Sequence, residues 1–180
     1  MKKENSVMYI LRLTVTLLLI CGAVAAVLAG VNAITKDKIA AIQEQKTQAA
    51  IAVVLPGVAG VEEIPVTGEN EIITAVYAAE NGYAVQVAPN GFDGAVTMMV
   101  GISDGKVTGI SVISHTETPG LGAVAAANNA KGEAFRGQLV GQSGTLVIGD
   151  QVDAMSGATI TSKAVVAGVN AALEYVGNLG

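Results

Sequence analysis

Hydroxyl side chains are concentrated near the carboxyl end of the chain, between Asp153 and Ser162. Four of them lie within seven residues, beside one glycine: Ser156, Thr159, Thr161, Ser162 and Gly157. A helical pattern follows, from Lys163 to about Val176. Free backbone N–H groups and the positive end of a helix dipole favour an anion, and glycine lets the backbone approach it. The segment therefore favours a phosphate site. The alternative is that Thr161 or Ser162 only caps the helix.

A second polar segment, from His115 to Gly122, contains the only histidine of the chain. With this histidine and one cysteine, Cys21, the chain has too few of the usual ligands for a zinc or iron–sulfur site, and no disulfide within the chain can form. We see no arrangement of nucleophile, histidine and acid, so we predict no catalytic residue. Nucleic-acid binding is not expected, because the net charge is −5 and basic residues form no stripe.

The amino-terminal part of the chain predicts a membrane anchor. Leu13 to Ile34 is a run of about 22 residues without a charge, which as a helix spans about 33 Å. A cleaved signal peptide is the alternative, because Val31 to Ala33 resembles a cleavage site, although the apolar run is longer than usual. Lys2, Lys3 and Arg12 precede the run, which places the amino terminus in the cytoplasm and the rest outside.

The elements that must position the polar segments follow the anchor. We expect a helix over Lys36 to Leu55, a loop over Val58 to Glu71 with Pro65 and Gly68, and two hairpins with turns at Asn81-Gly82 and Asp104-Gly105. The four strands are expected at Ile72–Glu80, Tyr83–Val87, Ala95–Ser103 and Lys106–Ser114, with a loop at 89–94 between the hairpins.

Three further elements complete the prediction: a helix over Ala123 to Phe135, a short strand over Gly144 to Gly149, and the last helix with Gly177 as C-cap. We therefore expect an α+β fold, an antiparallel sheet packed with helices, on a single N-terminal transmembrane helix. The expected domains are a cytoplasmic tip and anchor at 1–35, a juxtamembrane helix at 36–57 and an extracytoplasmic domain at 58–180.

Both polar segments resemble motifs of one family. Asp153-Ala-Met-Ser-Gly-Ala-Thr159 resembles the acceptor motif of flavinylated proteins, in which a flavin transferase joins FMN to the final threonine through a phosphoester. The segment from His115 to Gly122 resembles the His-x-Glu-Thr-Pro-Gly-Leu-Gly signature of the FMN-binding domain. With a membrane segment before them, the whole chain resembles the G subunits of the Rnf electron-transport complexes, relatives of the C subunits of sodium-pumping NADH:quinone reductases.

This resemblance implies covalent FMN on Thr159, in a protein that relays electrons outside the membrane. The implied complex passes electrons from reduced ferredoxin to NAD and moves sodium ions or protons outward; the implied partners are the A, B, C, D and E subunits of Rnf and a flavin transferase. The resemblance places a further set of residues in the flavin environment: His115, Glu117, Thr118, Leu121, Ser156, Gly157, Ala158, Thr161 and Ser162.

Three other functions stay open: the C subunit of the quinone reductase, a free-standing membrane-anchored FMN-binding sensor module, and a purely structural assembly protein. Asp153 matches the acceptor motif, and its alternative role is that of a carboxylate in a turn. A flavin requires an apolar slot, and the chain has no Trp and only six Phe and Tyr residues. We therefore expect aliphatic side chains and Met98 or Met99 to supply much of it. Strand alternation puts only one of these methionines on the core face, and simple packing is the alternative for either.

Overall fold

The computed structural model describes residues 6–58, 60–67 and 70–179. Three residues used in the predictions above, Lys2, Lys3 and Gly68, lie outside these ranges. The chain divides into two units, residues 1–45 and 46–180. Helix α1 (Ser6–Val54) forms the described part of the first unit and contributes its last turns to the second.

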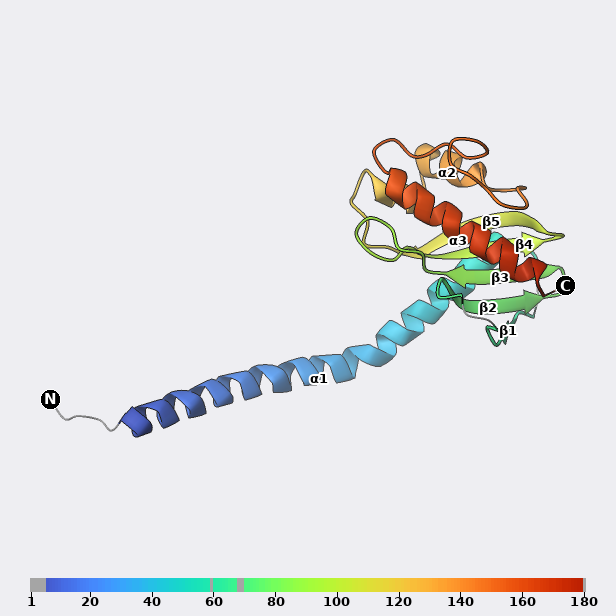
Figure 1. Cartoon of the computed structure of the whole chain (residues 1–180). Coiled ribbons are helices and arrows are strands. Elements are labelled where there is room, and N and C mark those ends of the chain that lie inside the picture. Colours follow the sequence, from blue (N-terminus) through green and yellow to red (C-terminus); the bar gives the residue numbers. More distant parts are fainter. Residues whose placement is uncertain (1–5, 59, 68–69, 180) are drawn as a thin grey trace. The chain divides into compact units, whose positions relative to one another are not determined.

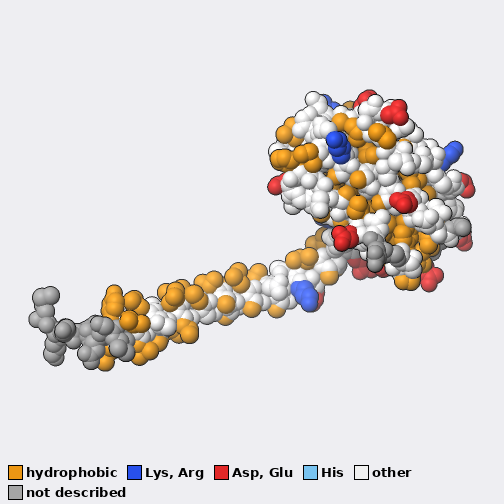
Figure 2. All heavy atoms as spheres, in the orientation of Figure 1, with side chains coloured by type: hydrophobic (Ala, Val, Ile, Leu, Met, Phe, Trp, Pro, Cys, Tyr) orange, Lys and Arg blue, Asp and Glu red, His pale blue; other side chains and the backbone are white. Residues whose placement is uncertain are grey.

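Helix α1 is apolar and exposed along the first unit. Its segment Met8–Val54 contains an 18-residue window with a mean hydropathy of 2.4, none of which is buried, and Figure 2 shows hydrophobic side chains along most of the helix. The helix is long and apolar enough to cross a membrane. The predicted anchor and juxtamembrane helices form one continuous helix, because neither Gly nor Pro interrupts the chain between Ile34 and Lys36. The predicted end before Pro56 is confirmed.

The second unit is built on a five-stranded antiparallel sheet with the strand order β1-β2-β3-β4-β5 (Figure 1). The strands are β1 (Glu62–Ile64), β2 (Ile73–Ala79), β3 (Gly82–Val87), β4 (Thr97–Ser103) and β5 (Lys106–Ser114). Both predicted hairpins are confirmed, with Asp104 and Gly105 at positive φ of 50° and 69°. Strand β1 lies where we predicted a loop, because three residues are too few to show an alternating pattern.

Both faces of this sheet are covered, as Figure 1 shows for helix α3 (Thr159–Gly177) on one of them. Met98 packs in the larger core with Val165 and Val169 of α3, whereas Met99 packs in a smaller core with Val54 of α1. The methionines do alternate along β4, but each one is fully buried. The prediction of a single core face was wrong, because the last turns of α1 cover the second face.

Glycines let α1 approach the sheet closely. A Cβ at Gly109 of β5 would lie 3.1 Å from the Cα of Val54, and one at Gly101 of β4 would overlap the Val54 carbonyl oxygen. That oxygen accepts a 2.5 Å hydrogen bond from the Thr108 hydroxyl. The end of α1 is therefore an integral part of the folded unit.

Two predicted elements differ from the structure. The helix expected over Ala123 to Phe135 is a short 3₁₀ helix, η1 (Gly122–Ala126), followed by α2 (Ala130–Gly137). Asn129 causes the break, because its side chain caps α2 by accepting from two backbone N–H groups. The strand expected over Gly144 to Gly149 is an irregular segment, because the Asn170 side chain hydrogen-bonds both backbone groups of Leu146.

Candidate functional site

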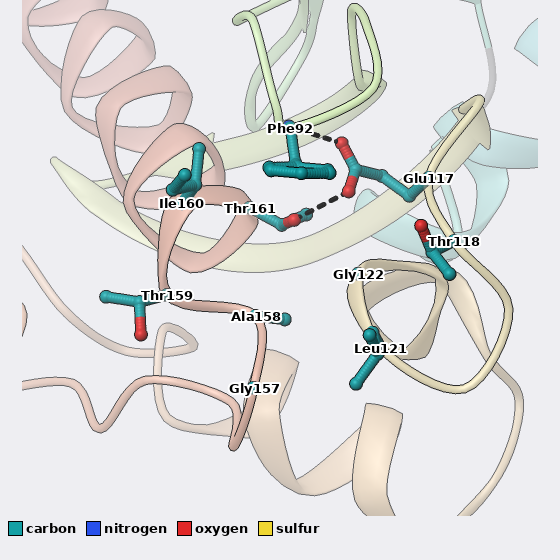
Figure 3. A pocket seen from close by; sticks show the side chains of 10 residues that line it. All are labelled: Phe92, Glu117, Thr118, Leu121, Gly122, Gly157, Ala158, Thr159, Ile160 and Thr161. Atoms are coloured by element: carbon teal, nitrogen blue, oxygen red, sulfur yellow. Dashed lines mark hydrogen bonds between the residues drawn. The ribbon is translucent and has the colours of Figure 1, made fainter.

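The two polar segments meet at one cavity of about 360 Å³. Its walls come from the loop between β3 and β4, the segment after β5, and the start of α3 (Figure 3). The lining residues are Phe92, Glu117, Thr118, Leu121, Gly122, Gly157, Ala158, Thr159, Ile160 and Thr161. This volume falls within the range of pockets that bind small organic ligands.

Glu117 joins all three walls of the cavity. Its side chain is only 4% exposed. One carboxylate oxygen accepts the Thr161 hydroxyl at 2.7 Å, and the other accepts the backbone N–H groups of Phe92 and Asp93 at 2.7 and 3.3 Å (Figure 3). Residues 25 and 44 positions away in the sequence are thus tied to a single carboxylate.

The same contacts decide the ionisation of Glu117. Burial by itself raises the pKa of this carboxyl, but the hydrogen bonds from Thr161, Asp93 and Phe92, together with the charge of His115, outweigh it and hold the pKa below its ordinary value. The carboxylate is therefore ionised at neutral pH, and its charge is compensated by donors on both oxygens.

Two glycines make room for the buried carboxylate. A Cβ on Gly91 would overlap one oxygen of Glu117, and a Cβ on Gly122 would overlap the other. The Gly122 Cβ would also lie 2.6 Å from the Thr161 hydroxyl oxygen. Glycine at both positions is thus a steric requirement of the site.

Helix α3 begins at the cavity, at Thr159, and not at Lys163 as predicted. Its first backbone hydrogen bond runs from the N–H of Ser162 to the carbonyl of Ala158, at 2.9 Å. The N–H groups of the three preceding residues therefore lie ahead of the helical hydrogen-bond ladder. The first turn itself carries no acidic side chain, and the carboxylate that contacts it is that of Glu117, which is bound to Thr161. The apolar periodicity placed the start of this helix too late in the sequence, because the first turn is rich in hydroxyl side chains and does not show the apolar pattern.

The four hydroxyls of the acceptor segment differ in what they contact. Thr161 and Ser162 are buried, at 1% and 0% exposure. Thr161 donates to Glu117, while Ser162 donates to the Ala158 carbonyl and accepts the N–H of Met155, both at 2.9 Å. Neither is an N-cap, because Ala158 holds that position. Ser156 and Thr159 are exposed.

Seven of the ten residues that the resemblance implied line this cavity, and three do not. Ser156 lines a neighbouring cavity of about 330 Å³, and Leu121 forms part of both. Ser162 stabilises the acceptor segment by hydrogen bonds to Met155 and Ala158. His115 is partly buried, and its buried Nδ1 makes no hydrogen bond to the described residues.

Three lining residues are outside the predicted set: Phe92, Gly122 and Ile160. Phe92 lies in the glycine-rich loop that we interpreted only as a turn, and an aromatic residue between glycines was the available signal. The methionines expected in the slot, Met98 and Met99, do not line the cavity, because both are buried in the cores on either side of the sheet.

Comparison with known families matches both parts of this structure. Residues 91–174, which include every lining residue of the cavity, match the FMN-binding domain. Residues 1–54, which include all of α1, match the RnfG N-terminal region. By these matches, an FMN-binding domain follows an apolar helix in this chain.

Relatives with established names extend this result to the whole chain. The G subunit of the Na(+)-translocating ferredoxin:NAD(+) oxidoreductase complex of Acetobacterium woodii is 33% identical, over 94% of this chain and 93% of its own. The G subunit of the ion-translocating oxidoreductase complex of Methanosarcina acetivorans is 33% identical, over 93% of this chain and 94% of its own. The G subunit of the proton-translocating ferredoxin:NAD(+) oxidoreductase complex of Clostridium ljungdahlii is 42% identical over 56% of this chain and 58% of its own.

The chain belongs to the family of G subunits of the Rnf ion-translocating oxidoreductase complexes. The resemblance found in the sequence is thus confirmed, as are the α+β fold and the single long N-terminal apolar helix. Its family and its apolar helix make it a membrane-anchored protein.

Proposed function

We propose that this protein is the electron-relaying G subunit of a membrane ferredoxin:NAD oxidoreductase complex coupled to sodium or proton translocation, and that it carries FMN joined to Thr159 by a phosphoester. The observation that carries the attachment site is the state of the four hydroxyls. Of the four hydroxyls between Ser156 and Ser162, only that of Thr159 is on an exposed residue of the cavity wall, whereas Thr161 and Ser162 are buried and hydrogen-bonded.

The surroundings of Thr159 suit a phosphate. It is the first residue of α3, where free N–H groups and the helix dipole favour a negative charge. Gly157, at a φ of 74°, takes a left-handed conformation that brings the chain around this helix end. In Figure 3 the Thr159 hydroxyl points away from Glu117, so a phosphoester there leaves the buried carboxylate undisturbed.

The rest of the cavity suits a planar, largely apolar ring. Phe92, Leu121 and Ile160 are 69%, 45% and 53% exposed, and all three line it. Large apolar side chains on an open cavity are typical of a ligand site. Bound FMN supplies reversible electron transfer. The protein residues hold the phosphate at the helix end, exclude water from the ring and, through Glu117, fix the walls.

The remaining assignments follow the family. We propose a cytoplasmic tip and transmembrane anchor at 1–35, a juxtamembrane helix at 36–57 and an extracytoplasmic FMN-binding domain at 58–180. The proposed partners are the membrane and the A, B, C, D and E subunits of Rnf, and a flavin transferase matures the protein. The relatives named for sodium and proton translocation support this assignment, since both are G subunits of ferredoxin:NAD(+) oxidoreductases.

The attachment site is tested with two isosteric variants of the full chain, each produced beside an active flavin transferase. Thr159→Val removes the exposed hydroxyl and should abolish covalent FMN, whereas Thr161→Val should retain it. In-gel flavin fluorescence under denaturing conditions reads the attachment, and peptide mass spectrometry locates it. A fluorescent Thr159→Val band, or a natural chain in which peptide mass spectrometry finds the flavin on another residue, contradicts the assignment.

A further inference from the structure

Phe92 is an exposed aromatic residue on a loop whose backbone is held firmly. Its side chain is 69% exposed and lines the cavity. An exposed phenyl ring keeps most of its apolar surface in contact with water, so this surface contributes no hydrophobic free energy to folding. Such a ring on the wall of a ligand cavity indicates that the ligand supplies the missing contact.

The loop around Phe92 is fastened to the segment after β5 at two points. The N–H groups of Phe92 and Asp93 donate to Glu117, and the Asp93 carbonyl accepts the Thr116 hydroxyl at 2.6 Å. A further 2.7 Å bond from the Gly91 N–H to the Gly94 carbonyl closes the loop on itself. The backbone is therefore fixed while the ring projects into the cavity, as Figure 3 shows.

Glu117 lines the cavity, and its hydrogen bonds also fix the Phe92 loop. Both of its oxygens already accept hydrogen bonds, one from Thr161 and one from the Phe92 loop. The Glu117 side chain is also only 4% exposed, so little of it is accessible to a ligand. Glu117 thus acts as a positioning residue, and Phe92 is the side chain that it positions.

We propose that the Phe92 ring packs against the isoalloxazine of the flavin and shields it from water, and that Glu117 holds the ring in place. This inference rests on the proposed function, because it requires FMN on Thr159. It assigns a flavin-contacting role to a residue outside both sequence motifs, and a supporting role to a residue inside one of them.

Phe92→Trp tests this contact in the flavin-loaded full chain. Indole quenches flavin fluorescence by electron transfer at van der Waals contact, and the natural chain contains no Trp. We expect the native fluorescence lifetime of Phe92→Trp to shorten several-fold and to recover on denaturation. The matched control is Val140→Trp. Val140 is also exposed, and its neighbour Gly141 hydrogen-bonds Val107 at the opposite end of β5 from the cavity. Equal native lifetimes in the two variants overturn the proposal.

The role of Glu117 is tested in the Phe92→Trp background. Glu117→Ala frees the loop and should restore a long native lifetime, whereas Glu117→Gln keeps an oxygen that accepts the Phe92 N–H and should stay quenched. A quenched Glu117→Ala variant with a native circular dichroism spectrum overturns the positioning role.

Attachment is measured separately, by flavin fluorescence in denaturing gels. If Phe92 does not contact the flavin, the fluorescent band is still present in every variant. If the chain carries no covalent FMN, the band is absent from the natural chain as well.

Discussion

Thr161→Val isolates the bond that ties helix α3 to the rest of the site. The variant keeps the shape of the side chain but removes the one donor found on that oxygen of Glu117, at 2.7 Å in a buried setting. A hydrogen bond to a charged group is worth about 1.5 to 3 kcal/mol. This loss is a large fraction of the roughly 5 to 15 kcal/mol that stabilises a typical domain. A helix cap, the role that the sequence left open for Thr161, is worth about 1 kcal/mol.

The expected effect is a fall in melting temperature of roughly 5 to 15 °C for a folded unit of this size. Near-ultraviolet circular dichroism of the buried and half-buried tyrosines reports unfolding of this unit without the large far-ultraviolet helical signal of α1. Thr161→Ser retains the donor and should recover most of the loss. Thr145→Val, an exposed site, should change the free energy of unfolding by no more than about 0.5 kcal/mol. If Thr161→Val melts like this surface control, the hydrogen bond to Glu117 does not hold the site together.

Two further predictions concern pH and topology. Because the folded state lowers the pKa of Glu117 below its ordinary value of 4.5, the carboxylate stabilises the fold above that value, and this contribution is lost as pH falls through the lower pKa of the folded state. Glu117→Gln lacks this titration. Its melting temperature should therefore fall less than that of the natural chain as pH is lowered from about 6 into the acid range. An equal fall in both proteins would refute the lowered pKa of Glu117. For topology, protease added to intact spheroplasts should digest the folded domain; protection of the domain, or a mature amino terminus near Ile34, would contradict a retained anchor with the domain outside.

The parts of the fold that the sequence predicted are those fixed by neighbouring residues. The dipeptides Asn81-Gly82 and Asp104-Gly105 set both hairpins, because a tight turn depends on the local backbone angles. Two of the parts it missed depend on distant contacts. Asn170 takes the backbone partners of Leu146 and prevents a strand, and the last turns of α1 turn the outer face of the sheet into a second core.

The candidate site also has features that are set by neighbouring residues and features that are set by distant ones. The segments that contain Glu117 and Thr159 were found from their residue patterns, because each is continuous in the sequence. Which hydroxyl is free could not be deduced, since the burial of Thr161 depends on a carboxylate 44 positions away. Phe92 was missed for the same reason: its place on the cavity is set by a bond to a residue 25 positions away.

These long-range bonds also explain why a buried carboxylate is useful at such a site. A buried charge is costly unless hydrogen bonds compensate it, and here the compensating donors belong to two different segments that line the cavity. If either segment moves away, the buried charge of Glu117 loses hydrogen bonds. The carboxylate therefore makes opening of the cavity unfavourable in free energy. An apolar residue at this position would fill the space but would attract neither wall. Glu117 thus maintains the shape of the cavity, while the Thr159 hydroxyl and the exposed apolar side chains are free to contact a cofactor.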